Sequence, residues 1–178
     1  MLEDLSTIEW VRLHHAYGPA DDVPDQLRVL ASTDSDARKE ALEELESNIW
    51  HQNTIYEATP YALPFLIELV KNQVPDSHSL LALIAEIVRG GFYLDVDVED
   101  ERNGTPEHLA KLRQELQFVQ LARQAVIRHA RPLLDLMESE DRFTRELSIF
   151  ILLTSAGIGS EAAHEVLESI FKNSFRSG

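Results

Sequence analysis

The sequence predicts an all-α protein of about three helix pairs plus terminal helices, and three observations lead to this class. Glycine and proline number only seven each, whereas leucine, alanine, glutamate and arginine, which favour helices, are frequent. Apolar residues recur at intervals of three and four in several segments, as in amphipathic helices. A short proline-started helix, a tight turn and a longer helix follow one another in three places. Three copies of such a unit indicate an α-α superhelix, a solenoid in which each unit covers its neighbour.

The charge balance narrows the classes of partner. The 178 residues carry a formal net charge of −15, which disfavours binding to phosphate backbones because that needs clustered lysine and arginine. The acidity suits a basic partner, although a well-solvated acidic surface is the simpler explanation. No cysteine is present, which excludes disulfides and thiolate metal sites. Without a secretory signal pattern or an apolar run long enough for a membrane, we expect a cytoplasmic protein.

The first helix is expected after Ser6, because Ser6 and Glu9 have the spacing of a capping box. This helix should end near Gly18. His14 and His15 are adjacent, so on a helix they point about 100° apart, which argues against a two-histidine metal site.

The first helix pair is predicted from Asp22 onward. Asp22 is the expected cap of a short helix that ends near Leu30, with Pro24 in its first turn. After a break at residues 32–34, a second helix should run roughly from Ser35 to Trp50. Its apolar stripe consists of Ala37, Ala41, Leu42, Leu45 and Ile49.

Two further units follow, with prolines expected to start equivalent short helices at Pro24, Pro64 and Pro132. The second unit breaks at residues 73–76 and its longer helix ends at Gly90. The third unit breaks at residues 138–141 and its longer helix runs through Leu153.

The first and third units share a pattern of three residues. The matching positions are Asp34, Arg38 and Ala41, and Asp141, Arg145 and Ser148. We expect the aspartate to cap the longer helix, the arginine to bond the cap or the neighbouring turn, and the small residue to permit close packing. The second unit has Leu80 at the arginine position, so its turn must be held in another way.

An acidic loop is inserted at about residues 92–105, before a long helix predicted from Pro106 to Arg128. Asp95, Asp97 and Glu99 alternate as in a calcium loop, but the required glycine and terminal glutamate are misplaced. A solvated loop and a partner-docking loop both remain open. A last helix is expected from Glu161 to about Asn173. The stripe of the long helix consists of Leu109, Leu112, Leu116, Val119 and Ala122.

The stretch from Ile49 to Leu66 is the densest in polar and aromatic chemistry. Asn53 can adopt a left-handed conformation, and we expect Thr59 to cap a helix that has Pro60 at its first position. The loop carries Trp50, His51, Gln52, Asn53, Tyr56 and Glu57.

Two resemblances rest on these residues. The spacing of turn aspartate, arginine and small residue resembles the HEAT repeat over roughly Val23 to Ala156. The run from Trp50 through Leu66 is similar to the Trp-His-Gln…Tyr-Glu-Ala-Thr-Pro-Tyr segment of a group of bacterial HEAT-like proteins, mostly without assigned activity. The resemblance implies one solenoid domain over residues 1–178, which docks partners on the concave face of its second helices. The exposed positions it implies are Arg38, Glu40, Glu44, Ser47, Asn48, Glu86, Arg89, Arg142, Arg145 and Glu146.

The sequence does not indicate an enzyme. His51, near Tyr56 and Glu57, is the best candidate for acid–base chemistry. However, the chain has no H-E-x-x-H, no G-x-S-x-G and no Gly-rich phosphate loop, so we expect no catalytic, metal or cofactor site. The candidate partner-binding residues are Trp50, His51, Gln52, Tyr56, Glu57, Arg38, Glu44, Glu86, Arg89, Arg142 and Arg145. In the alternative interpretation the loop is structural, with Trp50 packed between helices and Glu57 holding the loop in place.

We therefore expect a non-enzymatic solenoid that binds another protein but neither nucleic acid nor membrane, with its oligomeric state left open. An immunity-type inhibitor of a basic toxin is a special case, because an acidic surface opposes a basic nuclease. One alternative is a HEAT-like DNA-repair glycosylase, which demands a basic groove and is disfavoured by the charge of −15. Another is an enzyme-accessory protein of lyase type, for which the chain has no specific motif.

Overall fold

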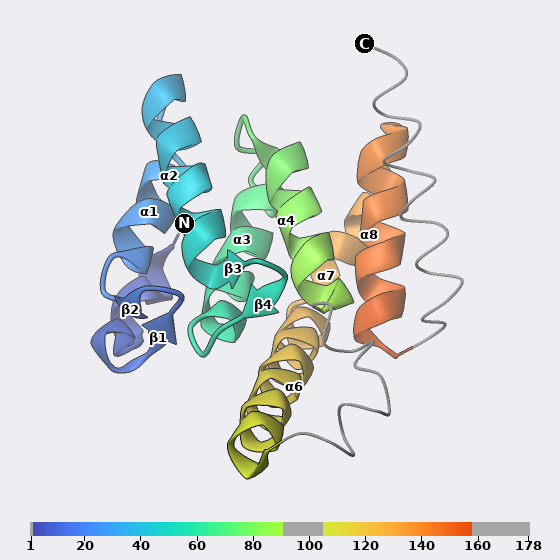
Figure 1. The fold of residues 1–178 in the computed structure, drawn as a ribbon. Helices are drawn as coiled ribbons and strands as arrows, with labels where there is room; N and C mark the ends of the chain where they lie inside the picture. The colour runs from blue at the N-terminus through green and yellow to red at the C-terminus, as the bar shows by residue number, and fades with distance from the viewer. Residues whose placement is uncertain (1, 91–104, 158–178) are drawn as a thin grey trace.

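The computed structural model describes residues 2–90 and 105–157 of the chain (Figure 1). The acidic insertion at residues 92–104, with its calcium-loop alternative, and the helix expected at residues 161–173 lie outside the described residues. Within them the protein is mostly helical, as predicted. The helices, in chain order, are α1 (Val23–Val29), α2 (Ser35–Ile49), α3 (Thr59–Lys71), α4 (Ser77–Arg89), α6 (Pro106–Arg128), α7 (Arg131–Leu136) and α8 (Arg142–Ser155).

The predicted pairs are present. Helix α1 packs on α2, α3 on α4, and α7 on α8, while α4 also lies against α8. The long helix α6 runs obliquely to the others and packs mainly on α3 (Figure 1). A continuous core of buried aliphatic side chains runs through these contacts. Its fully buried members include Leu27, Leu45, Ile49, Leu63, Leu66, Leu80, Ile84, Val126, Leu133, Leu147 and Ile151.

The N-terminal segment is not the helix that its capping-box pattern predicts. It forms the 3₁₀ turns Glu3–Thr7 and Trp10–Arg12, followed by two short strands, β1 (His14–His15) and β2 (Gly18–Pro19). Trp10 is 5% exposed, and its indole donates a hydrogen bond to the Leu5 carbonyl at 2.9 Å. Burial of this ring against Phe65 folds the segment back on itself, which a straight helix would not allow.

The expectation of no sheet is wrong for two hairpins. Besides β1 and β2, the strands β3 (Trp50–His51) and β4 (Thr54–Ile55) pair antiparallel. The turn residues Gln52 and Asn53 have φ angles of 50° and 63°. Two consecutive positive φ angles are typical of a type I′ turn, whose twist matches that of the paired strands. The left-handed conformation predicted for Asn53 is confirmed.

Thr59 does not cap α3 as expected. It is the first helical residue, and its hydroxyl donates to the Ile49 carbonyl at 2.6 Å and accepts from the Tyr56 amide at 2.9 Å. The side chain therefore joins the end of α2 to the turn that precedes α3. Thr59 is fully buried, so both bonds form out of contact with water.

The proline that starts the second unit is Pro60, and the prediction of Pro64 is wrong. Pro24, Pro60 and Pro132 each occupy the second residue of a helix, where the missing N–H group has no intrahelical partner to lose. Pro64 lies inside α3 instead. Pro64 lacks an N–H group, so the carbonyl of Pro60, one turn earlier, loses its intrahelical hydrogen bond.

The turn before the second helix of each unit is held by polar side chains. Asp34 caps α2 by accepting from the amides of Asp36 and Ala37, as predicted. Arg38, which is 7% exposed, donates to Asp76 Oδ2 at 2.6 Å and to the Ser32 carbonyl at 3.0 Å. The aspartate of the second unit is thus held by the arginine of the first.

The same relation links the second unit to the third. His78 Nε2 lies 3.1 Å from Asp141 Oδ2, and Asp141 caps α8 by accepting from the Thr144 amide at 2.8 Å. Arg145 donates to the Ser139 carbonyl in its own turn at 2.6 Å. The contacts Arg38–Asp76 and His78–Asp141, here called the turn ladder, connect the turns of all three units.

Helix α6 is capped and joined to the second unit by its own polar residues. Thr105 accepts from the His108 amide at the N-terminus, as the sequence pattern Thr-Pro indicates. Arg123 donates to the carbonyls of Val88 and Arg89 at 2.8 and 3.2 Å, which have no helical partners at the end of α4. Burial of this guanidinium lowers the pKa of Arg123.

Replacement of Arg38 by methionine should lower the free energy of unfolding by about 1–3 kcal/mol, because it leaves Asp76 and the Ser32 carbonyl without their charged donor. Urea denaturation measures the change. The control is Lys39→Met on the same helix, whose amine is exposed and lies 3.9 Å from Glu43. Its effect should remain within about 0.5 kcal/mol. Equal effects for the two variants would contradict the role of the turn ladder.

The stabilising effect of Asp141 should disappear in acid. Hydrogen bonds from Thr144, and then the nearby His78, lower the pKa of Asp141. Its contribution is therefore complete above the unfolded-state pKa of about 3.9 and lost as the pH falls through the lower folded-state value. Asp141→Asn keeps a capping side chain without the charge. Urea titrations should show a stability difference between wild type and variant above about pH 5 that vanishes toward about pH 2; a difference that persists in acid contradicts this.

Candidate binding surface and a neighbouring groove

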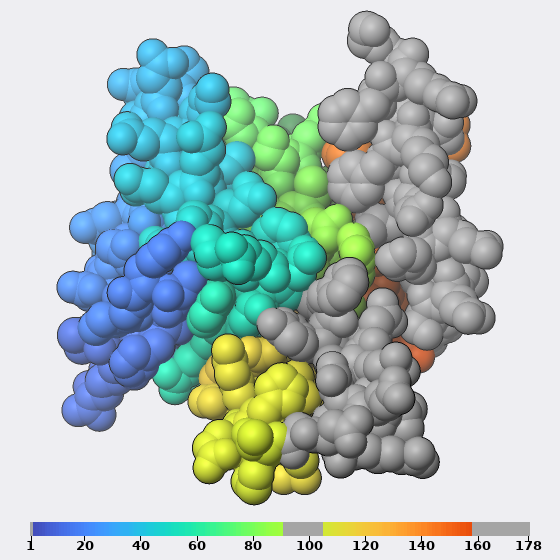
Figure 2. All heavy atoms as spheres, viewed as in Figure 1, coloured from blue at the N-terminus to red at the C-terminus, as the bar shows by residue number. Residues whose placement is uncertain are grey.

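The two hairpins lie side by side near the C-terminal end of α2. The Ala58 amide donates to the His14 carbonyl at 3.0 Å, and the Ala16 amide donates to the Asn48 carbonyl at 2.9 Å. Figure 2 shows the two segments as adjoining patches, dark blue and blue-green, on the near face of the molecule. Backbone bonds thus fix the position of each hairpin relative to α2 and α3.

A network of partly and fully buried polar groups supports the first hairpin. Asp22 accepts from Asn48 at 2.9 Å and from Gln26 at 3.2 Å, and its other oxygen lies 3.0 Å from His15 Nε2. His15 Nδ1 accepts from the Tyr17 amide at 3.0 Å, so Nε2 carries the proton that bonds Asp22. Two predictions are corrected here. Asp22 makes no capping bond to α1, and Asn48, expected to be exposed, is only 7% exposed.

Side chains from both hairpins meet above this network. The Tyr17 hydroxyl lies 3.0 Å from Ser47 Oγ and 3.2 Å from His51 Nδ1, and the Tyr17 and His51 rings pack edge to face. His14 Nδ1 lies 3.3 Å from Glu57 Oε2. We call the exposed area formed by His14, Tyr17, Ser47, His51, Gln52 and Glu57 the hairpin surface.

Three of the predicted loop residues belong to the hairpin surface. His51 and Glu57 are half-buried, and Gln52 is exposed at the tip of the second hairpin. Trp50 and Tyr56 are half-buried, and Trp50 packs against the core. Trp50 therefore fits the structural interpretation more closely than the others. His14 and Tyr17 were missed, because their contacts join positions up to 43 residues apart and no local spacing encodes them.

The remaining predicted residues lie elsewhere. Arg38 is buried in the turn ladder at the opposite end of α2, so its expected exposure is wrong. Arg145 is a half-buried residue near the start of α8, and it bonds the Ser139 carbonyl in the preceding turn. Glu44 is exposed on α2. Within single helices, Glu86 pairs with Arg89 on α4 at 3.0 Å, and Arg142 pairs with Glu146 on α8 at 2.6 Å.

The local geometry does not assemble an acid–base pair around His51. Glu57, the carboxylate nearest in sequence, contacts His14. The His51 ring is instead hydrogen-bonded through Nδ1 to the Tyr17 hydroxyl. General acid–base catalysis needs a titratable group directed at a substrate proton, usually oriented by a second group. The hairpin surface instead offers a set of exposed donors, acceptors and aromatic edges.

A cavity of about 240 Å³ separates the second hairpin from α6. His14, Tyr56, Glu57 and Phe118 line it together with Glu115. Burial raises the pKa of Glu115, and Lys111, whose amine is 3.8 Å away, opposes this shift. Glu115 Oε2 is buried and makes no hydrogen bond within the described residues. The cavity therefore places a carboxyl group next to aromatic rings at the edge of the hairpin surface.

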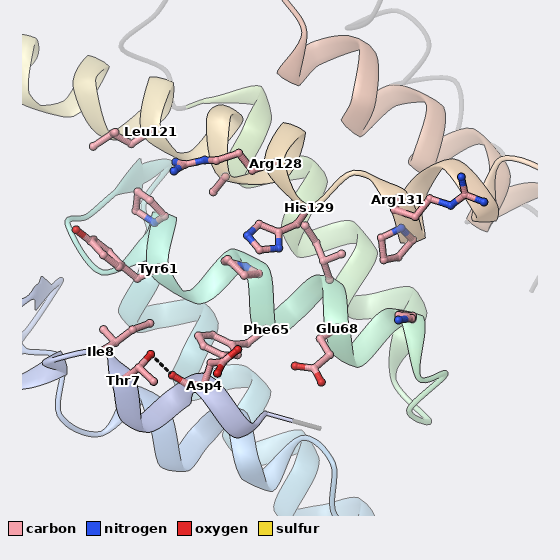
Figure 3. Close-up of a pocket in the computed structure, with 16 residues that line it drawn as sticks. Asp4, Thr7, Ile8, Tyr61, Phe65, Glu68, Leu121, Arg128, His129 and Arg131 are labelled. Carbon is pink, nitrogen blue, oxygen red and sulfur yellow. Dashed lines mark hydrogen bonds between the residues drawn. The ribbon is translucent and has the colours of Figure 1, made fainter.

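A second, larger concavity of about 750 Å³ lies between the N-terminal segment, α3 and the junction of α6 with α7 (Figure 3). We call it the α3–α6 groove. Pro60, Tyr61, Pro64 and Phe65 of α3 contribute to its lining. Sequence reasoning missed it, because its walls come from segments that are distant along the chain.

Two further findings concern residues 2–90 and 105–157. No cluster of three or more histidine, aspartate or glutamate side chains in these ranges could hold a metal ion. None of their helices combines the length and apolar character needed to cross a bilayer.

Comparisons with known protein families, with curated proteins and with solved structures found no match for the chain.

Exchange of Asn53 for alanine should destabilise the second hairpin by about 1–2 kcal/mol, because alanine is strained at positive φ. Asn53→Gly removes the side chain without this strain and should stay close to wild type. Hydrogen exchange of the amides from Trp50 to Glu57 measures the effect. Faster exchange in the alanine variant alone is expected, and equal exchange in both variants would show that the turn conformation is not what orders this segment.

Proposed function

We propose that the protein is a non-enzymatic binding protein of the HEAT-like α-solenoid class, and that its hairpin surface docks another protein. The observation that carries the proposal is the convergence of Tyr17, His51, Gln52 and Glu57 from two hairpins onto one ordered, exposed area. The solenoid class is supported by the three helix pairs and by the turn ladder that joins them.

The hairpin surface is suited to recognition because it is ordered before a partner arrives. Tyr17 is 65% exposed, yet its hydroxyl is positioned by Ser47 and His51. Docking on such a surface immobilises few additional side chains, so little conformational entropy is lost. Tyrosine is also among the residues that contribute most to protein interfaces.

The charge around the surface favours a basic partner. Glu40, Glu43, Glu44 and Glu46 are exposed on α2, which leads directly into the second hairpin. Partial burial, and then the charge of Glu43, raise the pKa of Glu46. A cationic partner would relieve this repulsion between carboxylates, and the net charge of −15 would accelerate its approach.

An inhibitor of a basic toxin remains the special case that fits this chemistry. A steered encounter between an acidic inhibitor and a basic enzyme is fast, and the inhibitor needs no catalytic group of its own. The glycosylase and accessory-protein alternatives remain predictions that no specific feature of the hairpin surface favours.

The double variant Glu44→Gln/Glu57→Gln, which removes two negative charges from this area, tests this proposal. The wild-type protein, immobilised, should retain a specific basic protein from a lysate of the source organism. Stopped-flow association of that protein with the variant should be several-fold slower at low salt, because steering is weakened, and equally fast at high salt.

The matched control is Glu138→Gln/Glu140→Gln, which removes the same charge from exposed positions in the turn before α8. Its association rate should stay closer to that of wild type. If both double variants slow association equally, only the net charge matters and the hairpin surface is not the docking site. Tyr17→Ala should in addition increase the dissociation rate; an unchanged rate would argue against contact there.

A further inference from the structure

The α3–α6 groove differs from the hairpin surface in its residues and in its charge. Its floor is apolar and comes from α3, where Phe65 is 6% exposed and Tyr61 is 45% exposed. Pro64 also lines the floor. Figure 3 shows Tyr61 and Phe65 facing the space between α3 and the N-terminal segment, which Ile8 borders. Aromatic and proline surfaces of this kind pack against flat or ring-shaped side chains of an extended peptide.

Two cationic side chains and a histidine line the groove beside this floor. Lys71 lies at the end of α3, and Arg128 and His129 lie at the end of α6. In Figure 3 the His129 ring projects from the end of α6 toward α3. The chain has 16 lysines and arginines against 31 acidic residues, so such a group beside an apolar floor stands out from the overall charge.

These three side chains are available to a ligand. Arg128 donates to the backbone carbonyl of Gln124 at 3.3 Å, and no ion pair of Lys71, Arg128 or His129 is found within the described residues. By contrast, Arg131 is occupied by Asp135 at 3.1 Å and is directed away from the groove in Figure 3.

Two acidic residues also line the groove, and one of them, Glu68, is engaged by the N-terminal segment. Both oxygens of Glu68 accept from the Leu2 amide, at 3.1 and 3.2 Å. Asp4 lies on the opposite wall, on the N-terminal segment. The volume of about 750 Å³ lies within the range of roughly 300–1,000 Å³ that is usual for sites enclosing a compact ligand.

We propose that the α3–α6 groove binds an extended peptide segment of a partner protein in which a carboxylate neighbours an aromatic or proline side chain. The ring packs on the exposed face of Tyr61, the carboxylate is received by Arg128, and Lys71 adds positive charge at the other end of the groove. Arginine is well suited to this role because its guanidinium can bond both carboxylate oxygens at once. The site is independent of the hairpin surface. It selects an acidic segment, whereas the hairpin surface favours a basic partner.

Selection of a random octapeptide phage library on the full chain tests the proposal. Enriched peptides should carry Asp or Glu within two positions of Phe, Tyr, Trp or Pro. A synthetic peptide of the most enriched sequence should lose about tenfold in affinity when its acids become amides, as expected for the loss of one charge-assisted contact. Calorimetric titration measures both affinities. No enrichment, or enrichment of peptides without acids, would overturn the proposal.

Variants locate the binding. Lys71→Gln/Arg128→Gln and, separately, Tyr61→Ser should each weaken the peptide by about tenfold or more. Arg113→Gln, which removes an exposed arginine from α6 outside the groove, should bind like wild type. All of these positions are exposed, so melting temperatures should stay close to the wild-type value. Unchanged binding by the Lys71/Arg128 and Tyr61 variants would place the peptide elsewhere.

Sedimentation velocity distinguishes two possible occupants of the groove, a partner peptide and a second copy of the chain. Because the proposal commits to a partner peptide, the free protein should sediment as a monomer at concentrations where the peptide binds. If the wild-type protein sediments as a dimer and the Lys71→Gln/Arg128→Gln variant as a monomer, the groove mediates self-association and the proposal is overturned.

Discussion

The turn ladder is the constraint on which the arrangement of the units depends. Short turns between paired helices leave backbone groups without helical partners, and in the first and third units aspartate and arginine side chains bond them. Arg38 does this for its own turn and, at the same time, binds the aspartate of the next. The Arg38 guanidinium is buried and the Asp76 carboxylate is partly exposed, so this ion pair ties the turns of the first and second units together.

Both candidate surfaces arise at boundaries between elements of this arrangement. The hairpin surface lies where the end of α2 meets the start of α3, and Thr59 joins the two by bonding the Ile49 carbonyl. The α3–α6 groove lies where α6 leaves α3 and α7 begins. Neither surface is the property of one helix, so a change in the stacking of the units would alter both.

The two surfaces also differ in charge, although the chain as a whole is strongly acidic. Acidic residues gather on α2 and beside the second hairpin, whereas Lys71 and Arg128 lie at the ends of α3 and α6. Such a separation gives the molecule an electrostatic asymmetry, which orients a charged partner before contact. The net charge alone would suggest a uniform preference for basic partners, and the acidic peptide that we propose for the groove departs from that expectation.

The sequence by itself determined the helices whose signals are local. Asp34, Thr105 and Asp141 cap helices within three residues of themselves, so their positions and the apolar stripes that follow were predictable. The tertiary structure decided the rest. Burial of Trp10 overrode the capping-box pattern at Ser6, and Pro64, expected to start a helix, lies inside α3. Pairs such as His14 with Glu57 lie far apart along the chain, and their meeting depends on how the hairpins pack, which no periodicity in the sequence records.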